Sequence, residues 1–158
     1  MSHQNKYKRG GFSLLELLLV VVIIGLIAAV AIPRLSRGAA GAADAALAGN
    51  LAVLREAIDR YSAEHVGAFP AVATFLAQVT QYTNEAGATS ATKTTTYIYG
   101  PYIRKIPPLP VGARKGQSGV AAAPGATIGW IYTQATGDIR SNTTAAEVDV
   151  TGKLYSTY

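Results

Sequence analysis

A run of 21 residues near the N-terminus, residues 12–32, is almost entirely apolar and limits what this chain can fold into. At the rise of an α-helix these residues span roughly 31 Å, which matches the hydrocarbon thickness of a bilayer. Lys6, Lys8 and Arg9 precede the run, and by the positive-inside rule they hold the N-terminus in the cytoplasm. The sequence therefore predicts one transmembrane helix, with the rest of the chain outside the cytoplasm.

Glu16 is the one charged residue within this run. A carboxylate there costs about 2.5 to 3.5 kcal/mol on insertion scales, so its presence requires an explanation. One explanation is that Glu16 lies a single turn from the cytoplasmic end and snorkels to the headgroups. The other is a cut between Gly11 and Phe12, which creates an α-amine that neutralises Glu16 of a neighbouring helix.

The stretch of residues 10–16, Gly-Gly-Phe-Ser-Leu-Leu-Glu, with the apolar run and Pro33 behind it, resembles the N-terminus of bacterial type IV pilins and type II secretion pseudopilins. The resemblance implies that prepilin peptidase cuts after Gly11 and that Phe12 becomes the N-methylated first residue. It also implies that Glu16 acts in assembly and that Pro33 kinks a long helix.

The later order of segments is most similar to the major pseudopilin of type II secretion, because Gly100-Pro101-Tyr102 and further prolines lead to a strand with Trp130. This resemblance implies a homo-oligomeric filament, a pseudopilus that drives protein export. The implied partners are prepilin peptidase, other pseudopilins and the inner-membrane secretion platform. The implied location is the bacterial inner membrane, crossed once, with the C-terminal domain in the periplasm.

Three other interpretations remain open. Residues 29–31, Ala-Val-Ala, resemble a signal-peptide cleavage site, although the apolar run is longer than the usual 7 to 15 residues. A type IV pilin, including a DNA-uptake pilin, has the same N-terminal motif. A membrane-anchored binding domain that never polymerises would use the helix as a plain anchor and the aromatic connector as a ligand surface.

Four segments follow from this pattern. They are a cytoplasmic leader (residues 1–11), the transmembrane helix (12–32), an amphipathic continuation of that helix (33–66) and a small periplasmic globular domain (67–158). The predicted fold class is α+β, in which the long helix packs on a short helix and a C-terminal antiparallel hairpin or sheet.

The continuation of the helix has an apolar stripe at spacings of three and four residues, typical of a core-facing helical face. Arg55 with Asp59 and Glu56 with Arg60 are spaced as i to i+4 ion pairs. We expect the helix to end near His65, before Gly67 and Pro70. The stripe comprises Leu47, Leu51, Leu54, Ile58 and Tyr61.

Pro33, Gly38, Gly41 and Gly49 should weaken the helix between its two halves, because proline removes a backbone donor and each glycine costs roughly 1 kcal/mol relative to alanine. We therefore expect this segment to kink or unwind when subunits pack.

The remaining segments are predicted from local composition. Val72, Phe75, Leu76, Val79 and Tyr82 have the spacing of a short helix that packs on the long one. The other expectations are a loop (84–96), an extended proline-rich connector (97–110), a second loop (111–125), a hairpin (127–133 and 138–141) and a further strand (148–154).

Catalytic chemistry has little support. The chain lacks cysteine, and its histidines are His3, in the leader, and His65, at a helix end. We therefore expect no enzyme and no cofactor. Asp138, Glu147 and Asp149 are weak calcium candidates, too sparse for an evident oxygen cluster, and a solvated surface is the preferred interpretation.

The net charge argues against a nucleic-acid partner. It is +5 from 14 basic and 9 acidic residues, but three of the bases lie in the leader, so the rest of the chain carries +2.

Overall fold

The computed structural model describes residues 12–158, apart from the side chains of residues 33, 36 and 37. Two compact units divide between Gly38 and Ala39. Helix α1, Leu14–Glu64, contributes to both units and has 51 residues. The predicted leader and the predicted cut after Gly11 lie outside the described residues.

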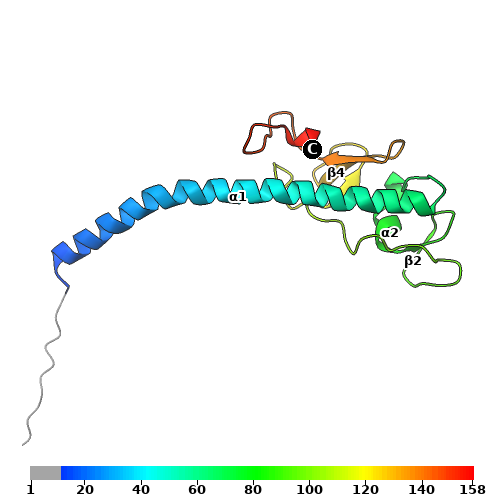
Figure 1. Cartoon of the computed structure of the whole chain (residues 1–158), viewed down its shortest axis with the longest axis horizontal. Coiled ribbons are helices and arrows are strands. Elements are labelled where there is room, and N and C mark those ends of the chain that lie inside the picture. The colour runs from blue at the N-terminus through cyan, green and yellow to red at the C-terminus, as the bar shows by residue number, and fades with distance from the viewer. Residues whose placement is uncertain (1–11) are drawn as a thin grey trace, which may run out of the picture. The chain divides into compact units, whose positions relative to one another are not determined.

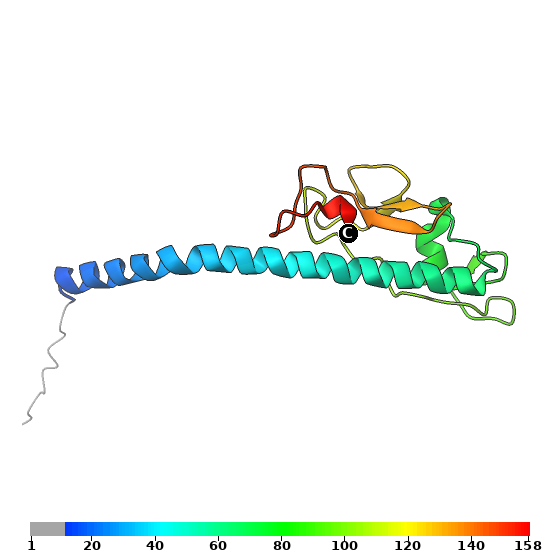
Figure 2. The ribbon, with the colours of Figure 1, turned by 45° about the horizontal axis from the view of Figure 1, so that its top comes forward.

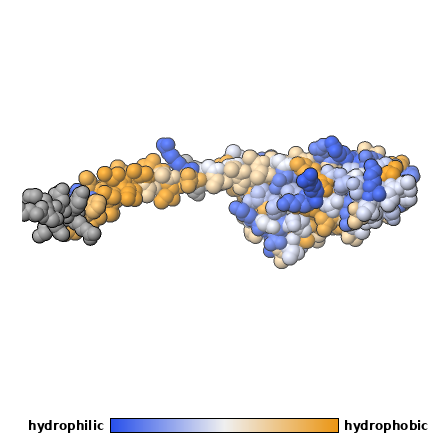
Figure 3. Space-filling model, turned by 90° about the horizontal axis from the view of Figure 1, so that it is seen from below, coloured by the Kyte–Doolittle hydropathy of each residue, from blue (hydrophilic) through white to orange (hydrophobic). Residues whose placement is uncertain are grey.

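In the first unit, α1 is apolar on all sides between Leu17 and Ile32. Its stretch Leu14–Ile32 has 19 residues, none of them buried, and is the one helix of residues 12–158 that is long and apolar enough to cross a membrane. Figure 3 shows apolar side chains along this part of the helix. A helix that is apolar all round with no protein packed on it is typical of a membrane span. The helical assignment passes through Pro33 without a break, and the kink there stays a prediction.

In the second unit, α1 buries the predicted stripe. Its five members are each at most 3% exposed: Leu47, Leu51, Leu54, Ile58 and Tyr61. Burying a large apolar side chain stabilises a fold by about 1.5 to 3 kcal/mol, which exceeds any difference in helix propensity along this segment. Tertiary packing therefore stabilises this part of the helix, and the predicted amphipathic face is confirmed.

Only one of the two predicted ion pairs on α1 forms. Glu56 and Arg60 approach to 3.0 Å on the exposed face. The predicted pair of Arg55 with Asp59 is wrong for the described part of the chain, because Arg55 donates instead to the backbone carbonyl oxygens of Ile139 and Tyr158. Carbonyls held in place by the fold compete well with a solvated carboxylate, whose surface ion pair contributes little.

Helix α1 ends where the sequence predicted. The backbone N–H of Gly67 donates to the carbonyl oxygen of Ser62 at 2.8 Å, and Val66 has a φ of 56°. This geometry is a Schellman motif, in which the residue after the C-cap adopts the left-handed conformation and is usually glycine. Valine holds that position here.

The predicted short helix is divided. Residues Val72–Thr74 form the 3₁₀ helix η1, and α2 covers Phe75–Thr80. Tyr82, predicted as helical, instead opens strand β1, Tyr82–Thr83, which pairs antiparallel with β2, Thr89–Ser90. The helical prediction for Tyr82 and the all-loop prediction for residues 84–96 are therefore wrong.

The turn between these strands explains the difference. The side chain of Asn84 accepts a hydrogen bond from the N–H of Ala88 at 2.9 Å, and the N–H of Gly87 donates to the carbonyl of Asn84. An asparagine that binds nearby backbone closes a tight turn, and the residues on each side then pair.

The connector of residues 97–110 is extended, as its prolines predict. A β-bridge between Tyr99 and Thr83 joins it to β1. The indole nitrogen of Trp130 donates to the carbonyl oxygen of Pro107 at 2.8 Å, which docks the connector on the sheet.

A three-stranded sheet has the order β3-β4-β5. Strands β4, Ile128–Thr133, and β5, Asp138–Ser141, form the predicted antiparallel hairpin. Strand β3, Gly119–Ala121, pairs parallel to β4 and lies within a segment predicted to be a loop. A stretch rich in glycine and alanine lacks the alternation of apolar and polar residues that predicts a strand. The segment is a strand because it pairs with β4.

The predicted strand of residues 148–154 is wrong, because an isolated bridge joins Val148 to Leu154 instead. The carboxylate of Asp149 accepts hydrogen bonds from the N–H groups of Thr151 and Lys153 at 2.7 and 2.9 Å. These amides bind a side chain rather than a neighbouring strand, so the segment turns and continues into η2, Tyr155–Thr157.

Helix α2 and the sheet lie beside the C-terminal part of α1 (Figures 1 and 2). Trp130 and Tyr132 of β4 are fully buried there, and the Tyr132 ring lies 4.6 Å from that of Phe75. The Tyr132 hydroxyl donates to the carbonyl of Pro70 at 3.0 Å. A long apolar helix, further short helices and small sheets make this an α+β fold, as the sequence predicted.

Candidate functional site

The N-terminus of α1 has a reciprocal side-chain cap. The backbone N–H of Ser13 donates to Oε2 of Glu16 at 2.8 Å. In return, Oγ of Ser13 accepts from the N–H of Leu15 at 3.2 Å. Ser13 is the N-cap and Glu16 the third helical residue, an arrangement known as a capping box. Two backbone donors that have no partner within the helix are thereby satisfied.

The cap lowers the free-energy cost of placing Glu16 in an apolar helix. A hydrogen bond to a charged group contributes about 1.5 to 3 kcal/mol, which is comparable with the roughly 2.5 to 3.5 kcal/mol cost of a carboxylate within an apolar span. The positive end of the helix dipole adds about 0.3 to 1 kcal/mol. Within a single chain the cap therefore offsets much of the cost of Glu16.

This cap was not predicted from the sequence, although the spacing Ser-x-x-Glu before an apolar run is a known signal for it. In the part of the chain that the structure describes, Oε2 of Glu16 takes part in the cap and Oε1 accepts no hydrogen bond.

The other predicted assembly residues lie as follows. Phe12 is the first described residue and is 80% exposed, and Leu14 is 86% exposed, so the side chains on both sides of Ser13 are open. Pro33 lies in α1, 17 residues after Glu16. The structure brings Phe12 and Glu16 to the same end of the helix, and Gly11 is outside the described residues.

Each of the weak calcium candidates binds its own chain. Asp138 accepts from the hydroxyl of Thr136 at 2.7 Å. Glu147 accepts from the N–H groups of Thr144 and Ala113 at 2.6 and 2.5 Å. Across residues 12–158 no three histidine, cysteine or acidic side chains are grouped so that they could hold a metal ion.

Hydrogen bonds also shift the ionisation of two of these acids. The backbone N–H of Thr144 is the main cause of a lowered pKa at Glu147. The pKa of Asp149 lies far below its usual value because it accepts from the hydroxyls of Tyr158 and Thr151. These carboxylates are ionised and occupied with holding the C-terminal turn.

His65 has a packing role at the end of α1. It is 3% exposed, its Nδ1 lies 2.7 Å from the carbonyl oxygen of Tyr61, and its ring stacks on that of Tyr61 at 3.8 Å. Nε2 has no partner within the described chain, and no nucleophile or acid is placed against it in the way that catalysis requires.

Comparison with known proteins adds one finding about the N-terminus. The family model for the prokaryotic N-terminal methylation motif matches residues 6–32. This match supports the pilin and pseudopilin families, whose members are structural proteins processed by prepilin peptidase. The single apolar helix fits the membrane anchor of prepilin-like proteins. Among curated proteins and among solved structures, no match to the chain was found.

Proposed function

We propose that this chain is a pseudopilin, a structural subunit of a type II secretion pseudopilus that drives protein export. Prepilin peptidase cuts it between Gly11 and Phe12, Phe12 is N-methylated, and the mature subunits polymerise. The observation that carries the proposal is the match of the methylation motif to residues 6–32, at the head of one helix of membrane-spanning length.

The proposed organisation follows from this role. Residues 1–11 are a cytoplasmic leader, residues 12–32 anchor the subunit in the bacterial inner membrane, and residues 33–66 extend the helix into the periplasm. Residues 67–158 complete the periplasmic domain. Pro33 lets the helix kink where subunits pack, because proline removes one helical hydrogen bond.

Glu16 then has two successive partners. Before assembly it caps its own helix through the N–H of Ser13. After cleavage, the new α-amine of Phe12 on an adjacent subunit offers a full positive charge in an apolar medium, where an unpaired carboxylate is costly. Because the cap uses Oε2, the amine can bind Oε1 while the cap persists. This pairing would set the register between neighbouring subunits.

Secretion, rather than a type IV pilus, is supported by the connector. Its Gly100-Pro101-Tyr102 segment is docked on α1, where the hydroxyl of Tyr102 donates to Glu64 at 2.6 Å. It then leads to the strand of Trp130, in the order that resembles the major pseudopilin. Deletion of the gene separates the two roles, since loss of exported enzymes is expected for secretion, and loss of twitching or DNA uptake for a pilus.

Mass spectrometry of the mature N-terminus tests the proposal most directly. We expect a chain that begins with N-methylated Phe12. The control is a strain without prepilin peptidase, in which Met1 or Ser2 should remain at the N-terminus. A functional chain that keeps its first eleven residues, or one cut after Ala31, would refute the pilin route and favour an anchored domain or a signal peptide.

A further inference from the structure

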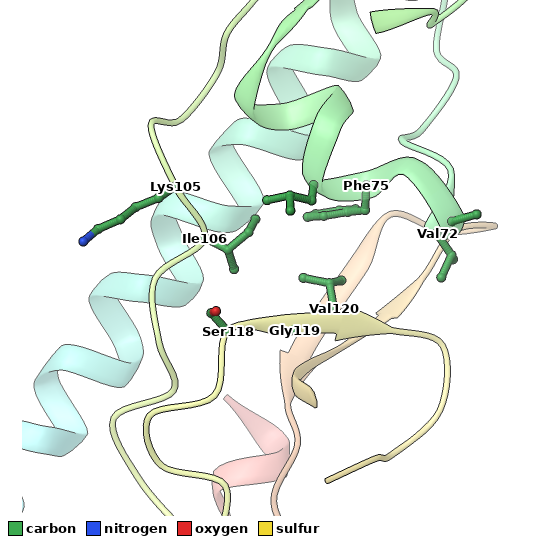
Figure 4. Close-up of a pocket in the computed structure, with 9 residues that line it drawn as sticks. Val72, Phe75, Lys105, Ile106, Ser118, Gly119 and Val120 are labelled. Carbon is green, nitrogen blue, oxygen red and sulfur yellow. The ribbon is translucent and has the colours of Figure 1, made fainter. Parts of the chain in front are cut away.

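A groove runs along α2 on the second unit. Two pockets of about 460 and 440 Å³ share Ala73, Leu76 and Lys105, and so form one continuous depression. We call it the α2–β3 groove. Figure 4 shows Val120 of β3 pointing across it toward Phe75 and Ile106, while Lys105 extends outward at one side.

The groove exposes apolar surface that the fold leaves uncovered. Leu76 is 61% exposed, although its neighbour Phe75 is 2% exposed and Val79 is fully buried. The sequence predicted that Leu76 would pack on the long helix, and the structure corrects this. Adjacent residues of a helix point about 100° apart, so Leu76 faces away from the core into which Phe75 is buried. An exposed leucine beside a half-buried valine on β3 forms an apolar patch open to another molecule.

The sheet offers an open edge at the same place. Strand β3, Gly119–Ala121, is the outer strand of the order β3-β4-β5, and its residues Gly119 and Val120 line the groove together with Ser118. Apart from its pairing with β4, strand β3 makes no backbone hydrogen bond within residues 12–158. An open strand edge beside apolar pockets is the arrangement that binds an extended peptide as an added strand.

The charge of the groove selects the type of peptide. Arg104 and Lys105 are exposed and are the charged residues of the lining, which contains no acid. In the described chain the one ion pair joins Arg60 to Glu56, so neither groove cation has a carboxylate partner there. A ligand with carboxylates would supply the complementary charge.

We propose that the α2–β3 groove binds an extended acidic segment of a different protein, one that adds to the edge of β3, places an apolar side chain against Leu76 and Val120, and pairs its carboxylates with Arg104 and Lys105. This inference goes beyond the proposed filament, because the occupant is a heterologous partner of the subunit rather than another copy of it.

A second copy of this chain does not have the required segment. Outside α1, the acids of the described chain are Glu85, Asp138, Glu147 and Asp149. The last three accept hydrogen bonds from their own chain, and Glu85 lies in the tight turn between β1 and β2. None of them belongs to a free extended stretch, so a second copy cannot supply the carboxylates that would pair with Arg104 and Lys105.

The test uses the full chain in detergent micelles and a fluorescein-labelled eight-residue peptide of alternating valine and glutamate. We expect saturable binding by fluorescence anisotropy that weakens as salt rises. Lys105→Glu should lower the affinity by roughly tenfold or more, since a like charge then faces the ligand. Leu76→Ser should lower it severalfold. Both side chains are exposed, so neither change threatens folding.

Arg140→Glu is the matched control, because Arg140 is also an exposed base but lies on β5, outside the groove lining. It should leave the affinity unchanged. A peptide with lysine in place of glutamate, and one with alternate backbone amides methylated, should bind at least tenfold more weakly. Equal binding of either peptide, an equal loss in Arg140→Glu, or no binding of the acidic peptide would overturn the proposal. So would concentration-dependent self-association that Lys105→Glu abolishes, which would assign the groove to a second copy.

Discussion

Val66→Gly should stabilise the second unit. Val66 follows the end of α1 with a φ of 56°, a conformation that costs an L-residue about 1 to 2 kcal/mol and is unusual for a β-branched side chain. Its side chain is 87% exposed, so truncation gives up at most roughly 0.4 kcal/mol of apolar burial. Glycine also makes the unfolded chain more flexible, which reduces the gain from the relieved strain by about 0.4 to 1 kcal/mol.

The central values of these terms leave a gain of about 0.5 kcal/mol in the free energy of unfolding, or roughly 2 °C in the unfolding midpoint. Urea unfolding of the full chain in detergent micelles, followed by tryptophan fluorescence, measures it. The chain has one tryptophan, and Trp130 is fully buried in the second unit, so its emission reports the unfolding of that unit alone.

Gly67→Ala is the matched control at the neighbouring position. Gly67 has a φ of 83°, and a Cβ added there would meet nothing within 4 Å. The substitution therefore adds backbone strain without a clash and should destabilise by roughly 0.5 to 1 kcal/mol. If Val66→Gly were neutral or destabilising while Gly67→Ala behaved as expected, the strain assigned to Val66 would be refuted.

Three further outcomes are expected. Glu16→Ala should leave the precursor inserted and cleaved but impair filament assembly. Ser13→Ala retains the carboxylate and costs about 1 kcal/mol of helix capping, so this control should still assemble. Normal filaments from Glu16→Ala, seen by electron microscopy, would contradict the pairing. Hydrogen bonds lower the pKa of Asp149 in the folded state, so the ionised carboxylate stabilises the fold at neutral pH, and this stabilisation is lost as the pH falls below 3.8, the ordinary pKa of an aspartate. Asp149→Asn should therefore destabilise the fold at pH 7 and make its stability depend less on pH in the acid range. An unchanged loss of stability with falling pH would count against this. Tyr132→Phe should lose about 1 kcal/mol of stability with the hydrogen bond to Pro70, and a wild-type urea midpoint would show that this bond contributes nothing.

The spacing of neighbouring residues was sufficient to predict helix α1 and its N-terminal motif. The stripe that begins at Leu47 was predictable because its period of three and four residues is a property of adjacent sequence, and the structure buries every member. The hairpin of β4 and β5 was predictable for the same reason. The capping box of Ser13 and Glu16 was also present in the sequence as a four-residue spacing.

Contacts between distant segments were not predictable in this way. Arg55 prefers carbonyls on residues 139 and 158, which lie 84 and 103 positions away along the chain, over the acid one turn along its own helix. Asp149 binds the turn of its own segment and removes a predicted strand. Leu76 has a helical spacing that indicates burial, yet it faces the open groove.

The sequence by itself determined the apolar helix of membrane-spanning length, its N-terminal motif and the core-facing stripe, since each depends on residues within a few turns of one another. The tertiary structure alone decided that a short run of glycine, valine and alanine becomes β3, and that basic and apolar side chains from α2, the connector and this strand line one groove. These features depend on which surfaces the folded chain brings together and which it leaves uncovered, and that is set by the packing of segments far apart in sequence.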